Sequence, residues 1–129
     1  MVFDIHYLDL FKVHVVTTKG VMTGRDFVVM AKALLDCDDW AEGNNVLFDH
    51  RKLDFSNTSL DDLQEIRLFH KANGEKIGKG KSAIVLEQGF LTKWVTLWSQ
   101  GSRIQTGNSL EIFEDYDQAL SWTKRKDSK

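Results

Sequence analysis

The chain has 129 residues, a formal net charge of -2 and a hydrophobic fraction of 42%, values that fit one globular domain with its own core. A charge this close to zero gives no broad positive field for nucleic acid or an anionic membrane. The single cysteine, Cys37, excludes an internal disulfide and favours a reducing compartment. Neither an 18-residue apolar run nor a signal-peptide pattern is seen, so we expect a cytoplasmic protein without an integral membrane segment.

The first elements predicted are an antiparallel hairpin and a helix. Phe3, Ile5 and Tyr7 alternate along one run, and a short join near residues 9–10 leads to a second run with the same period. Thr23 then provides an N-cap for a helix over residues 23–35, with an acidic residue three positions later.

Short apolar strands alternate with helices along the rest of the chain. In order, we expect a strand at 46–48 ending at Asp49, a polar loop over 50–58, a helix capped by Ser59 with Asp62 at N3, a loop over 73–81, a strand at 83–86, a helix at 90–99, a strand at 110–113 and a helix from Asp115. The order β-β-α-β-α-β-α-β-α predicts an α/β fold with a mainly parallel sheet after the hairpin. We assign one domain to residues 1–123 and a charged tail to residues 124–129.

Several segments resemble STAS-type domains in their order and spacing. Residues 20–26 resemble the family's entry to the first helix, residues 46–49 followed by 59–63 resemble its central strand and second helix, and residues 83–85 resemble its next strand. Residues 112–122 resemble the C-terminal segment of domains of the SpoIIAA-like branch, because Phe, an acidic residue, Ala-Leu and Trp follow one another at the same spacing. The resemblance implies a STAS/SpoIIAA-like fold that is related to the CRAL-TRIO lipid-transfer domains.

The resemblance also implies a region of interest at the start of the second helix. In the STAS anti-sigma-factor antagonists, a serine at this place is phosphorylated, and its charge controls docking of a kinase partner. Here Phe55, Ser56, Asn57 and Thr58 stand where those proteins have an Asp-Ser-Ser-Gly-type stretch. This departure argues against the same phospho-switch and leaves open whether Ser56, Thr58 or Ser59 is modified.

A candidate binding edge follows from the topology, because open parallel sheets bind ligands beyond the carboxyl ends of their strands. The residues placed there supply acid, base, hydroxyl and cation: Asp49, His50, Arg51, Ser56, Asn57, Thr58 and Ser59, with Glu87 nearby. No nucleophile elbow or triad spacing accompanies them. We therefore expect a non-enzymatic, regulatory module without a cofactor, recognising a protein partner or a small anion at the loop 49–59 edge.

The segment at 90–99 is unusually apolar for a surface helix. Its stripe consists of Phe90, Leu91, Trp94, Val95 and Trp98. Three interpretations stay open: a well-buried core helix, a homodimer interface centred on Trp94 and Trp98, and the mouth of a small apolar-ligand site. The third would make the protein a lipid or apolar-ligand carrier, which is the alternative function.

The other chemistry-bearing residues have simpler interpretations. The loop over 73–82 ends Gly80-Lys81-Ser82, but Glu75 replaces a required glycine and a strand follows, so we expect a solvated, basic turn. His6 and His14 are two polar residues on the wetter face of the hairpin, and no metal site is expected. Cys37 is an inert thiol because carboxylates surround it.

Overall fold

A computed structural model describes residues 1–54, 56–87 and 109–124, and for residues 109 and 110 it describes the backbone only. The described elements are β1 (Val2–Leu8), β2 (Val13–Val21), α1 (Gly24–Leu35), β3 (Asn45–Asp54), α2 (Leu60–Ala72), α3 (Gly74–Ile77), β4 (Lys81–Val85), β5 (Ser109–Phe113) and α5 (Tyr116–Lys124). The predicted helix at 90–99 and residues 125–129 of the predicted tail lie outside the described residues.

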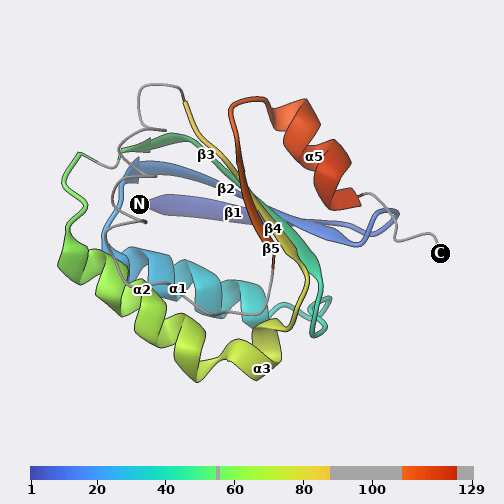
Figure 1. The fold of residues 1–129 in the computed structure, drawn as a ribbon, viewed down its shortest axis with the longest axis horizontal. Helices are drawn as coiled ribbons and strands as arrows, with labels where there is room; N and C mark the ends of the chain where they lie inside the picture. The colour runs from blue at the N-terminus through green and yellow to red at the C-terminus, as the bar shows by residue number, and fades with distance from the viewer. Residues whose placement is uncertain (55, 88–108, 125–129) are drawn as a thin grey trace.

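The strands form one five-stranded sheet in the order β1-β2-β3-β4-β5. β1 pairs antiparallel with β2, and each later neighbour pairs in parallel. Helices α1, α2 and α3 lie against one face of this sheet, while α5 lies against the other (Figure 1). The predicted α/β fold with a mainly parallel sheet and an N-terminal hairpin is confirmed.

Two apolar layers hold these elements together. The larger layer packs α1 and α2 on the sheet through residues such as Met30, Leu34 and Ile66. The smaller layer joins Val15, Leu47 and their neighbours to α5. Successive strand residues point to opposite faces, so the apolar run of β3 serves both layers.

The predicted polar loop over residues 50–58 is wrong for its first half, because β3 continues to Asp54. β2 is long enough to pair with this extension, out to Val21 opposite Asp54. The register shifts on the way, so β3 uses one more residue than β2 between the flanking pairs, as in a β-bulge. Arg51 and Lys52 are consequently both exposed, while Leu53 returns to the core.

Two further expectations need correction. The loop over 73–81 contains the short helix α3, and a Cβ at Gly78 or Gly80 would collide with the backbone of Gly43, so close packing explains these glycines. His14 is fully buried rather than on a wet face. Its ladder partner is Tyr7, whereas His6 is opposite Val15, so the two histidines point to opposite faces. No metal-binding group of His, Cys, Asp or Glu occurs in the described ranges.

Candidate functional site

A polar depression lies at the carboxyl end of the parallel strands. β4 is paired with β3 as far as Val85 opposite Asp49, whereas β3 continues to Asp54. The space beside this step has a volume of about 340 Å³ and is lined by Thr17, Thr18, Asp49, Arg51, Lys52 and Glu87. Open parallel sheets commonly bind ligands at this edge.

An ion pair within β3 forms the floor of the depression. Asp49 is buried, and its carboxylate accepts hydrogen bonds from Arg51 Nε at 2.8 Å and Arg51 Nη2 at 2.7 Å. Burial opposes ionisation of Asp49, but the hydrogen bonds from Arg51 outweigh it and hold the pKa of this carboxyl below its usual value. The same bonds raise the pKa of the Arg51 guanidinium. The carboxylate is thus a fixed acceptor rather than a base.

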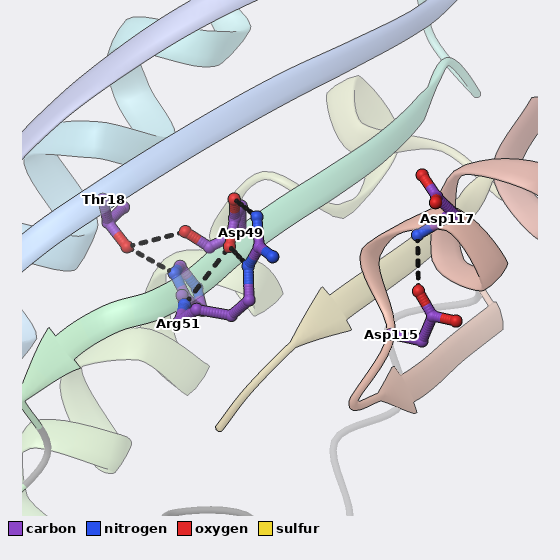
Figure 2. Close-up of polar contacts among 6 residues, drawn as sticks. Thr18, Asp49, Arg51, Asp115 and Asp117 are labelled. Carbon is purple, nitrogen blue, oxygen red and sulfur yellow. Dashed lines mark hydrogen bonds and ion pairs between the residues drawn. The ribbon is translucent and has the colours of Figure 1, made fainter. Parts of the chain in front are cut away.

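Arg51 is also held from the α5 side. Its guanidinium lies 5.1 Å from the centre of the Tyr116 ring, the first residue of α5. A cation over an aromatic face is attracted by the ring quadrupole. The start of α5 is itself ordered by Asp115, which accepts a hydrogen bond from the backbone N–H of Asp117 at 2.9 Å (Figure 2). Arg51 is therefore fixed by contacts from both β3 and α5.

Thr18 lines the depression and also contacts His50, whose side chain lies on the opposite face of the sheet. Its hydroxyl donates to the carbonyl oxygen of Asp49 at 3.3 Å (Figure 2). The same hydroxyl lies 2.7 Å from His50 Nδ1. His50 points toward α1, where its ring lies edge-on to Phe27 with centroids 6.4 Å apart, and it stacks on Phe48 of its own strand with centroids 5.5 Å apart. Burial lowers the pKa of His50 to about 3, although Asp49 partly opposes the shift. The imidazole is therefore neutral at physiological pH.

The remaining predicted site residues lie at the turn into α2. Ser56 and Asn57 are exposed, while Thr58 is buried with its hydroxyl 3.9 Å from the sulfur of Met22. Ser59 caps α2 and forms the predicted capping box with Asp62. None of these four residues lines the depression. The structure thus brings Asp49 and Arg51 together, turns His50 away, and places residues 56–59 at a helix start.

Sequence reasoning missed four contributors to the site. Thr17, Thr18 and Lys52 line the depression, and Tyr116 covers Arg51. The polar pair at 17–18 within a β-branched strand was the available signal for the two threonines. Lys52 could not be placed without knowing where β3 ends, and Tyr116 depends on the docking of α5.

The predicted aromatic stripe of Phe90, Leu91, Trp94, Val95 and Trp98 lies outside the described residues. Between α1, α2 and the sheet, the described part of the chain has a small, partly open and mainly apolar hollow of about 40 Å³, lined by residues including Phe27, Trp40 and His70. This volume is about that of one water molecule in the liquid. It is far smaller than the 300–1,000 Å³ typical of ligand pockets.

The strand order, the parallel pairing and the placement of helices on both faces define a SpoIIAA-like fold. The structure is similar to the crystal structure of an uncharacterized protein of the DUF3478 family, with a SpoIIAA-like fold, from Shewanella loihica PV-4. The TM-score is 0.61 and the identity 21%, over 95% of this chain and 92% of that chain. The predicted resemblance is confirmed at the level of the fold, and the relation to CRAL-TRIO domains stays a prediction.

Comparison of sequences adds nothing to this likeness. No family model matches the chain, and no curated protein matches it. None of the described helices is both long enough and apolar enough to cross a membrane.

Proposed function

We propose that this protein is a non-enzymatic, STAS-like binding module that regulates a process by recognising a protein partner or a small anion at the polar depression. The observation that carries the proposal is the preformed arrangement at its floor. Asp49 and Arg51 are joined by two hydrogen bonds, and the ring of Tyr116 covers the Arg51 guanidinium. Lys52 and Glu87 carry opposite charges and join no ion pair in the described ranges. A fixed, charged surface of this kind favours recognition by electrostatic complementarity.

The chemistry of the lining residues supports binding over catalysis. A general base needs a pKa near the working pH and access to the substrate. Asp49 has a lowered pKa and is occupied by Arg51, and His50 is neutral and faces the helices. Asp49 and His50 are therefore both committed to structural contacts. The alternative of an apolar-ligand or lipid carrier depends on residues 90–99 and is kept as a second prediction.

Affinity capture followed by native mass spectrometry tests the proposal. The wild-type chain is compared with Lys52→Glu, which reverses one charge at the depression, and with the matched control Lys79→Glu, which reverses an exposed charge in the loop before β4. We expect the wild type and Lys79→Glu to retain the same protein or small anion. Lys52→Glu should bind the same protein or anion with an affinity lower by about tenfold or more. This corresponds to the loss of a charge interaction of about 1.4 kcal/mol or more.

Two results would contradict the proposal. Equal retention by the two variants would place recognition elsewhere, and turnover of a defined substrate by the purified chain would make it an enzyme. Extraction of a co-purified lipid would instead favour the carrier alternative.

A further inference from the structure

β1 is an edge strand with regular, open geometry. It pairs with β2 without interruption from Val2 opposite Lys19 to Leu8 opposite Val13, and no other strand of the described ranges pairs with it. Proteins commonly block such edges with lysine, proline or a bulge. β1, with the sequence VFDIHYL, has neither of those residues and its register shows no shift. Its outer edge is therefore a template for another strand.

The sequence of β1 is nearly symmetric about Ile5, because residues at equal distances on either side of it have similar or complementary side chains. On either side of this residue stand Asp4 and His6, an acid and an imidazole. Phe3 and Tyr7 follow as an aromatic pair, and the outermost pair, at positions 2 and 8, is aliphatic. In an antiparallel pair of two identical strands centred on Ile5, each residue would therefore lie opposite a suitable partner.

The exposure of these side chains fits the same arrangement. Val2 is 57% exposed, and Asp4 and His6 are exposed on the same face. On the other face Phe3 and Ile5 pack against the larger core layer but are only half-buried. A strand added at this edge would cover apolar surface on both faces and place the Asp4 carboxylate of each copy beside the His6 imidazole of the other.

We propose that β1 is an isologous homodimer interface, in which the β1 strands of two copies pair antiparallel about a twofold axis at Ile5. The partner is a second copy of this chain, because the acid, aromatic and aliphatic pairs are complementary to themselves under twofold symmetry. The two five-stranded sheets become one continuous sheet. The interface uses the outer edge of β1, whereas the polar depression is lined by residues of β2, β3 and Glu87, and the two regions adjoin where Asp4 pairs with Thr17. It uses other residues than the dimer predicted for Trp94 and Trp98.

Sedimentation velocity over a concentration series tests the interface through a charge swap. His6→Asp places carboxylates opposite Asp4 twice in each dimer, and we expect the dimer dissociation constant to rise about tenfold or more because like charges oppose each other across the strands. The double variant Asp4→His/His6→Asp restores the two pairs of carboxylate and imidazole and should restore the dimer. Gln118→Glu on α5 adds the same charge on another exposed surface and should leave dimerisation unchanged.

Amide hydrogen exchange on the wild-type protein tests the same interface without any variant, so its result does not depend on whether the variants fold. Amide hydrogen exchange in β1 should slow as the protein concentration rises, because outward N–H groups gain partners in the dimer. The proposal is overturned by a wild type that stays monomeric at high concentration. It is equally overturned by a dimer that folded His6→Asp leaves intact, by a folded double variant that stays monomeric, or by β1 exchange rates independent of concentration.

Discussion

His50 illustrates how a single residue can be chemically suggestive in the sequence and structurally committed in the fold. As a histidine beside an aspartate at the end of an apolar strand, it was a natural candidate for recognition. Strand alternation decides otherwise, because β3 continues past Asp49 and the next side chain must point to the opposite face. Position along the chain could be predicted, but orientation depended on the unpredicted end of the strand.

Burial of His50 has a measurable consequence for stability. Its folded pKa of about 3 lies below the ordinary value of 6.5, so the unfolded chain binds an additional proton between these values. The stabilising effect is fully present above pH 6.5 and is lost as the pH falls toward 3. Each proton of difference changes the free energy of unfolding by about 1.4 kcal/mol per pH unit.

We predict that His50→Gln reduces the pH dependence of the free energy of unfolding between pH 6 and 4 by about 1 kcal/mol per pH unit. Urea denaturation at several pH values measures it. Thr18→Val is the comparison, because it removes the hydroxyl beside Nδ1 while keeping the buried imidazole. It should lower stability at every pH without changing the slope. Parallel pH profiles for His50→Gln and the wild type would contradict the prediction.

At the scale of elements, α1 and α2 begin side by side on one shared carboxylate. Asp62 accepts from the backbone N–H of Ser59 at 2.9 Å and from that of Gly24 at 2.8 Å. The capping box within α2 could be predicted, since Ser and an acid at the right spacing define it. The bond to α1 is 38 residues away in sequence and carries no local signal. The structure therefore adds a link between two helix starts that sequence spacing describes as separate.

We predict that Asp62→Asn lowers the free energy of unfolding by about 1–2 kcal/mol, because an amide replaces one acceptor oxygen with a donor facing other donors. Asp61→Asn removes the same charge from the same helix turn but is exposed, and should cost only a few tenths of a kcal/mol. Chemical denaturation at pH 7 compares the two variants. Equal losses would mean that charge near the helix start matters and the shared bonds do not.

The strands show why some element boundaries were predictable and others were not. The apolar cores of β3 and β4 were recognised from short runs of Val, Leu, Ile and Ala. The second half of β3 was missed because its polar residues resemble a loop, whereas pairing with the long β2 holds them in the sheet. Tertiary pairing overrides local composition here, and the bulge that exposes both Arg51 and Lys52 has no sequence pattern of its own.

On the scale of the whole molecule, the order of elements was the most predictable feature. Strands alternating with helices after a hairpin specify a mainly parallel sheet, and the likeness to a solved SpoIIAA-like fold agrees. The location of the depression follows from that topology. Its composition does not, because Thr17, Glu87 and Tyr116 come from three separate parts of the chain and meet only through packing. The fold alone does not determine the function.

The proposed function depends most on the polar depression being the recognition surface, and amide chemical-shift mapping of the isotope-labelled wild-type chain tests this directly. The protein or anion retained in the capture experiment is titrated into the chain. We predict the largest shift changes at Thr17, Lys52 and Glu87, with little change in α3 at the opposite end of the parallel strands. Changes concentrated on α1 and α2, with the depression unaffected, would contradict recognition at the depression.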